Sequence, residues 1–171
     1  MKQILLLRHA KSSWDDESLK DFDRPLAKRG RNDASRMGDF VRKLNIKPSI
    51  IISSPAARAK ETALLFAKAA KCEEEIIEWK SGLYYGTSAD YLETIKNVSN
   101  NCETVLLVGH NPLIENTAGT LVGESNGISI TMPTAALVML TTYVPTWKQV
   151  NWGTCELNWM MIPKALKKIM K

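Results

Sequence analysis

Apolar residues are distributed along the chain in two kinds of segment. Short continuous apolar runs, typical of buried strands, lie at residues 3–7, 49–53, 75–79 and 104–108. Longer segments repeat apolar residues every three or four positions, as a helix with one buried face does, and they cover residues 28–44, 55–70, 88–98 and 112–121. Strands that alternate with helices predict βαβ units and a mostly parallel sheet covered by helices on both faces.

The C-terminal part departs from this alternation. Residues 135–143 and 154–162 have the pattern of strands, and residues 163–171 that of a short terminal helix. The link between these two strands is too short for a crossover helix, so they should be antiparallel. The expected fold is a single-domain three-layer α/β sandwich over residues 1–171, with a mixed, mostly parallel sheet.

Two helix starts are predicted from capping residues. Ser54 precedes Pro55 at the beginning of one helical segment, and Asn111 precedes Pro112 at the beginning of another. A small polar cap followed by proline at the first helical position is a common start signal.

Composition narrows the class of protein. The chain is 44% hydrophobic and 24% charged, as ordinary globular proteins are. Its three cysteines are far apart, without the spacing of a metal or redox site, which favours a reducing, cytoplasmic compartment. The four apolar residues before Arg8 are too few for a signal peptide or a membrane span, so we expect a soluble, unprocessed protein without a membrane partner.

The charge balance is basic, with a net charge of +5. A basic chain suits anionic ligands. The lysines are spread along the sequence, with one cluster in the tail from Lys164 to Lys171, and are not interleaved with aromatic residues. We therefore expect no nucleic-acid partner.

Polar residues that could perform chemistry follow directly on the apolar runs. His9 comes after Arg8 at the end of the first predicted strand, and His110 follows Gly109 after a later one. Ligands of open parallel sheets bind beyond the carboxyl ends of the strands, so both histidines should lie at one edge. Arg58 lies in the first turn of a helix that begins at the same edge. Arginines and helix N-termini both favour oxyanions, and phosphate above all.

These residues point to phosphoryl transfer. Two neighbouring arginines disfavour protonation of an imidazole, and a neutral imidazole is a nucleophile. Arginines around the equatorial oxygens supply the electrostatic stabilisation that phosphoryl transfer mainly requires. The pattern therefore predicts a phosphohistidine enzyme intermediate. The sequence contains no recognisable set of metal ligands, and we expect neither a metal nor another cofactor.

Four segments resemble the motifs of the histidine phosphatase (phosphoglycerate mutase-like) superfamily. Residues 6–13 (LLRHAKSS) are similar to its RHG motif, and residues 53–63 (SSPAARAKETA) to its second motif. Residues 108–112 (VGHNP) are similar to the third, and the segment from Arg24 to Gly30 resembles the one between the first two. The alanine after the first histidine and the short chain are most similar to the SixA-like branch of phosphohistidine phosphatases.

The resemblance implies a role for each residue. His9 is the nucleophile that becomes phosphorylated, while Arg8, Arg58 and His110 take part in catalysis and bind the phosphate. Ser12 and Arg24 are further substrate-binding residues, with Ser12 at a position that contacts phosphate and Arg24 at the border of the pocket. The implied partner is a phosphorylated protein carrying phosphohistidine, or a small phosphorylated molecule.

Two departures from the family pattern bear on the substrate. Mutases and many phosphomonoesterases of the family have a glutamate general acid where this chain has residues 82–86 (GLYYG). An alkoxide leaving group needs a proton donor, whereas the basic imidazole of phosphohistidine needs it less. Asp15, Asp16, Asp23 and Tyr85 remain candidate acids. The segment from 72 to 104 is also too short for the large cap insertion of mutases.

Other functions stay open at this point. A small-molecule phosphomonoesterase of the same superfamily is the first alternative, and a non-catalytic phosphate- or phosphoprotein-binding module is the second. The intact nucleophile and both arginines argue against the binding module. Asp21 and Asp23 resemble a haloacid-dehalogenase motif, but no apolar strand precedes them.

Overall fold

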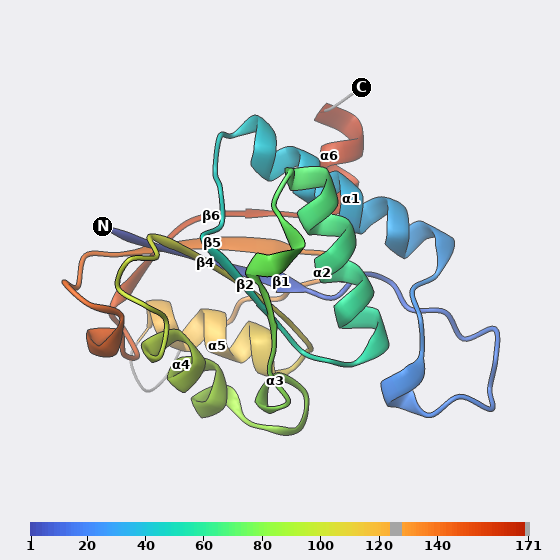
Figure 1. Cartoon of the computed structure of the whole chain (residues 1–171), viewed down its shortest axis with the longest axis horizontal. Helices are drawn as coiled ribbons and strands as arrows, with labels where there is room; N and C mark the ends of the chain where they lie inside the picture. Colours follow the sequence, from blue (N-terminus) through green and yellow to red (C-terminus); the bar gives the residue numbers. More distant parts are fainter. Residues whose placement is uncertain (124–127, 170–171) are drawn as a thin grey trace.

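The centre of the molecule is a six-stranded sheet with the strand order β3-β2-β4-β1-β5-β6 (Figure 1). The computed structural model describes residues 1–123 and 128–169. Strands β1 to β4 pair in parallel, and β5 is antiparallel to both of its neighbours. The strands are β1 (Lys2–Arg8), β2 (Ile50–Ser53), β3 (Ile77–Trp79), β4 (Thr104–Gly109), β5 (Leu137–Thr142) and β6 (Cys155–Met161). The expected mixed, mostly parallel sheet and its antiparallel last pair are confirmed.

Helices cover both faces of this sheet, which makes the expected three layers (Figure 1). One layer contains α1 (Lys28–Lys43), α2 (Ala57–Ala70) and α6 (Pro163–Ile169). The other contains α3 (Gly82–Tyr85), α4 (Ser88–Lys96) and α5 (Leu113–Val122). Among the residues that the structure describes, no helix combines the length and the apolar composition needed to cross a bilayer.

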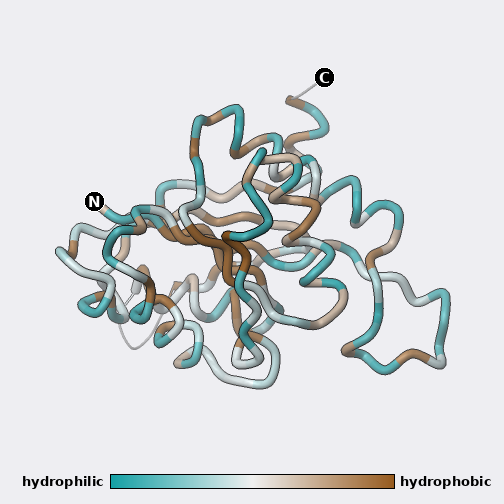
Figure 2. Tube along the Cα trace, in the orientation of Figure 1, coloured by the Kyte–Doolittle hydropathy of each residue, from teal (hydrophilic) through white to brown (hydrophobic). Residues whose placement is uncertain are grey.

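The continuous apolar run of β1 follows from burial on both faces. Leu5 and Leu7 pack in the core cluster beneath α1 and α2, while Ile4 and Leu6 pack in the cluster formed with α4 and α5. All four side chains are fully buried. Figure 2 shows the resulting band of apolar residues along the central strands. A strand covered on both sides has no polar face, so its sequence shows no alternation.

Both predicted helix caps are wrong, and for the same reason. Helix α2 begins at Ala57 and α5 at Leu113, and neither has a side-chain cap. The Ser54 hydroxyl contacts His110 Nε2 at 2.8 Å, and the Asn111 amide donates to Glu115 and to the carbonyl of Met132. Neither side chain caps the backbone of the helix that follows it, and each also contacts a residue distant in sequence, His110 for Ser54 and Met132 for Asn111.

Smaller differences concern the edge of the sheet and the C-terminus. Strand β3 starts at Ile77, two residues later than expected, after a 3₁₀ turn over residues 74–76. The short helix α3 was not predicted. The terminal helix is described to Ile169, and residues 170–171 of the expected helix lie outside the described residues. Residues 71–103, all described, contain β3, α3 and α4, so the expected absence of a large cap insertion is confirmed.

A tyrosine on α4 fixes the end of β4. The Tyr91 hydroxyl donates to the carbonyl of Leu83 (2.9 Å) and accepts the backbone N–H of His110 (3.3 Å). A Cβ atom at position 109 would overlap this hydroxyl, so only glycine allows the close approach. Tyr91 thereby determines where the chain leaves the sheet.

Replacement of Gly109 by alanine should therefore destabilise the protein by about 1–3 kcal/mol, the usual cost of overpacking. Urea-induced unfolding measures this change. Because Tyr91→Phe removes the atom nearest to the added Cβ, the double variant Gly109→Ala/Tyr91→Phe should be more stable than the sum of the two single changes predicts. Strictly additive effects would contradict this account.

Candidate active site

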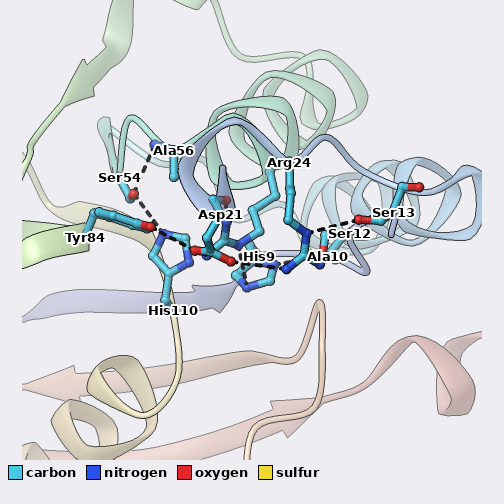
Figure 3. Close-up of polar contacts among 11 residues, drawn as sticks. His9, Ala10, Ser12, Ser13, Asp21, Arg24, Ser54, Ala56, Tyr84 and His110 are labelled. Atoms are coloured by element: carbon cyan, nitrogen blue, oxygen red, sulfur yellow. Dashed lines mark hydrogen bonds and ion pairs between the residues drawn. The ribbon is translucent and has the colours of Figure 1, made fainter. Parts of the chain in front are cut away.

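The pairing of β1 with β4 brings the two histidines together. Arg8 is the register partner of Gly109, so the next residue of each strand, His9 and His110, leaves the sheet at the same level. The two rings lie with their centroids 4.9 Å apart (Figure 3). Both histidines are buried. The expectation that they share one edge of the sheet is confirmed.

The contacts of His9 define its tautomer. Its Nδ1 lies 2.8 Å from the carbonyl oxygen of Ala10. Because a carbonyl oxygen can only accept, Nδ1 holds the proton, and Nε2 presents a lone pair. Nε2 faces Arg58, whose Nε donates to it at 3.3 Å. The ring is thus oriented with an unprotonated nitrogen next to a guanidinium.

Burial keeps both imidazoles neutral. It lowers the pKa of His9 to about 4, with help from the charges of Arg58 and Arg8 and against the hydrogen bond to Ala10. Burial, followed by the neighbouring His9 and Arg58, lowers the pKa of His110 to about 3. At neutral pH the site therefore holds two uncharged rings beside cationic arginines.

Arg58 connects the histidines to a loop between β1 and α1. Its Nη1 donates to the carbonyl of Asp21, and its Nη2 donates to the Asp21 carboxylate at 2.8 Å. The carboxylate of Glu61, three residues further along α2, binds Arg31 instead, at 2.5 Å. Arg58 is buried and directed into the site from the first turn of α2.

Two buried nitrogen atoms at the site have no hydrogen-bond partner among the described residues, Nε of Arg8 and Nδ1 of His110. Nη1 of Arg8 donates to the carbonyl of Met132 at 2.7 Å, which holds the guanidinium in place. His110 is held through Nε2 by the hydroxyl of Ser54. A buried polar atom without a partner costs stability, so both atoms are available for a hydrogen bond to a ligand.

The remaining predicted residues, Ser12 and Arg24, are linked to the histidine pair through Asp21 and Arg58. Arg24 is buried, and its Nη2 donates to the Ser12 hydroxyl at 2.8 Å. Its Nη1 donates to the Asp21 carboxylate at 3.1 Å, and its guanidinium lies over the ring of Trp14. The ion pair of Arg24 with Asp21 thus exists, and through that carboxylate Arg24 also reaches Arg58 (Figure 3).

Sequence reasoning missed two residues that the structure brings into the site. Asp21 accepts from Arg58 and Arg24 and also from the hydroxyl of Tyr84, at 2.8 Å. The Tyr84 ring packs edge-on against His110, with centroids 5.2 Å apart. The sequence contained a partial signal, since Asp21 lies three residues before Arg24, a common spacing for an ion pair.

The candidate acids named from the sequence are all exposed to solvent. The Asp15 carboxylate accepts from the hydroxyl of Ser13 at 2.5 Å and is exposed, as are Asp16 and Asp23. Tyr85 is 73% exposed and stacks against Phe22. The tyrosine that contacts the histidine pair is its neighbour, Tyr84.

The arrangement has the composition of an anion site, with an unprotonated nitrogen, Nε2 of His9, beside Arg58. Two arginines and two neutral imidazoles converge, and the Nε2 lone pair of His9 lies among donors suited to equatorial phosphoryl oxygens. Within the described part of the chain, no group of three or more histidine, cysteine or acidic side chains is arranged to hold a metal ion.

Comparison with known proteins gives one consistent family. The family model described as histidine phosphatase superfamily (branch 1) matches residues 4–96. A chloroplastic protein of Arabidopsis thaliana, itself uncharacterised, is 33% identical over 156 residues, which cover 86% of this chain and 70% of that protein.

Solved structures agree with this match. The putative phosphohistidine phosphatase SixA from Agrobacterium tumefaciens has a TM-score of 0.78 at 28% identity, over 95% of this chain and 98% of that one. The protein histidine phosphatase SixA in complex with tungstate has a TM-score of 0.82, over 96% of this chain and 99% of that one. At 20% identity, the second similarity is one of fold alone.

An NMR titration of the two imidazole rings tests the electrostatics of the site. Because both pKa values are lowered, to about 4 and about 3, neither ring should gain a proton as the pH falls from about 8 to about 5. The unfolded protein in guanidinium chloride is the control, and there both rings should titrate near the ordinary value of about 6.5. A folded-state pKa close to that value for either ring would refute the neutral pair.

Proposed function

Since the chain belongs to the histidine phosphatase superfamily and is a phosphatase of SixA-like fold, we propose that it hydrolyses phosphohistidine on a partner protein through a phosphorylated His9. The observation that carries this proposal is the state of His9. Its Nδ1 donates to Ala10, its Nε2 is unprotonated, and its pKa is about 4. Such a ring can attack phosphorus at neutral pH without first losing a proton.

The first step transfers the phosphoryl group from the substrate to His9. Nε2 forms the new N–P bond, and the bond to the leaving group breaks on the opposite side of phosphorus. Arg58, which already touches Nε2, interacts with an equatorial oxygen. The phosphorylated ring keeps the proton on Nδ1, and the Ala10 carbonyl stabilises the positive charge that develops there.

Arg8 and His110 supply further donors to the phosphoryl oxygens. The unpartnered Nε of Arg8 provides one N–H. The Ser54 hydroxyl can donate to Nε2 of His110, which leaves the proton of the neutral ring on the unpartnered Nδ1. In the second step water attacks phosphorus, phosphate is released, and Nε2 recovers its lone pair.

The leaving group decides the substrate class. Burial and the hydrogen bond to Asp21 raise the pKa of Tyr84, so its phenol is a weak acid at neutral pH. A buried glutamic acid poised to protonate an alkoxide has no counterpart in residues 82–86. The N–P bond of phosphohistidine breaks without this help, because its leaving imidazole is protonated on the other nitrogen beforehand. The SixA structure from Agrobacterium tumefaciens, which is 28% identical to this chain, is described as a putative phosphohistidine phosphatase, and this supports the same class.

Two further proposals concern the setting of the enzyme. Residues 1–171 form one phosphatase domain, because both helical layers pack on a single sheet. The three cysteines are free thiols, which fits a reducing compartment such as the cytoplasm.

Turnover of a phosphohistidine-carrying transfer domain, measured beside a panel of small phosphate esters, tests the proposed function. We expect phosphate release from the protein to be much faster than from the esters. His9→Ala should reduce release by about 10³-fold or more, because no other group can form the intermediate. Circular dichroism checks that this variant folds. Full activity without His9 would refute the nucleophile, and rapid release from the esters alone would indicate a small-molecule phosphatase.

Ser54→Ala tests the orientation of His110. Loss of this hydrogen bond should lower kcat by about fivefold to tenfold while the protein stays folded, since one such bond is worth about 1 kcal/mol. Ser49→Ala is the matched control, because that hydroxyl accepts backbone amides at the opposite end of β4. Equal kcat values for the two variants would contradict the role of Ser54.

A further inference from the structure

The Asp21 carboxylate binds the same cations that a phosphoryl group needs. Oδ2 accepts from Arg58 Nη2 and from the Tyr84 hydroxyl, both at 2.8 Å, and Oδ1 accepts from Arg24 at 3.1 Å. The side chain is still 56% exposed to solvent. Asp21 therefore lies at the border between the buried anion site and the surface from which a substrate arrives.

This carboxylate is negatively charged when a substrate binds. Burial would raise the pKa of Asp21, but hydrogen bonds from Tyr84 and Arg58, together with the charges of Arg58 and Arg24, outweigh that effect and leave the pKa below its ordinary value. Asp21 consequently cannot donate a proton to a leaving group at neutral pH. Its effect on the reaction must come from its charge.

The sign of the charge on the leaving group then determines whether the Asp21 carboxylate attracts or repels that group. When an ester is cleaved, the leaving oxygen takes the electron pair of the O–P bond and becomes negative next to Asp21. A phosphorylated imidazole that is protonated on its second nitrogen brings a positive ring instead. As its N–P bond breaks, the electron pair neutralises this ring, and the positive charge passes to the newly phosphorylated ring of His9. Asp21 thus faces a positive charge throughout the transfer.

We propose that Asp21 is the specificity-determining residue of the site, and that its carboxylate favours a cationic nitrogen leaving group and disfavours an anionic oxygen one. This inference rests on the proposed function and adds the residue that selects the substrate class. Tyr84 is a positioning residue in this scheme, because its hydroxyl holds the carboxylate while its ring packs on His110. Arg24 holds the same carboxylate from the other side.

Two small probes of similar size test the proposal, phosphoimidazole and phenyl phosphate. They differ mainly in the charge of the leaving ring, so a comparison of their kcat/KM values isolates the electrostatic effect. Asp21→Asn should lower kcat/KM for phosphoimidazole by about tenfold and leave that for phenyl phosphate unchanged or higher. Asp21→Glu, which restores the charge, should restore most of the preference. Glu17→Gln removes one exposed negative charge from the same loop, and it should change neither value.

The possible outcomes distinguish a failure of this inference from a failure of the proposed function. If Asp21→Asn lowers both kcat/KM values by the same factor, Asp21 only supports Arg58 and the inference is wrong, while the proposed function stands. If the wild-type protein prefers phenyl phosphate, the proposed function fails and the inference fails with it. If it hydrolyses neither probe, the inference is wrong, while the transfer-domain assay still decides the proposed function. A loss of preference in Asp21→Asn together with its recovery in Asp21→Glu supports both.

Discussion

In-register parallel hydrogen bonding between β1 and β4 is the constraint on which the site depends. It pairs Arg8 with Gly109, so His9 and His110 leave the sheet side by side. A slip by one residue would move one histidine to the other face of the sheet and separate the rings. The side chains of β1 oppose such a slip because each is close-packed in one of the two core clusters. The geometry of the two rings is therefore maintained by the whole core.

The electrostatics of this site keeps the two imidazole rings neutral. Two buried imidazoles lie beside the buried guanidinium of Arg58 and the half-buried Arg8, an arrangement that disfavours protonation of the rings. Burial of these polar groups costs free energy. Fixed backbone acceptors, such as the carbonyls of Ala10 and Met132, offset part of that free energy. The unpartnered nitrogens of Arg8 and His110 remain free to form hydrogen bonds with a ligand. We therefore propose that the site is preorganised to bind an anion.

Sequence reasoning could predict what depends on local pattern and on strand ends. The apolar runs predicted the strands, and the polar residues after them identified His9, Arg58 and His110, which the structure brings together. It could not predict contacts made by irregular segments. Asp21 lies in a connection without periodicity, and its partners Arg58 and Tyr84 are 37 and 63 residues away.

The helix caps failed for a related reason. Ser54 and Asn111 are residue types common at caps, but besides local contacts to Ala56 and Glu115 their side chains bind His110 and Met132, which are distant in sequence. Local rules describe the competition between a side chain and its own backbone. They contain no information about a histidine that arrives from another strand. The residues with the strongest local signals can therefore be recruited by the site instead.

We propose that Nε2 of His9 is the atom that receives the phosphoryl group. The most direct measurement is ³¹P–¹H correlation NMR of the phosphorylated enzyme, trapped at alkaline pH, where phosphohistidine is stable. The account predicts one phosphoryl group on Nε2 of His9, because Nδ1 is occupied by its hydrogen bond to Ala10. A phosphoryl group on Nδ1 of His9, or on His110, would contradict it.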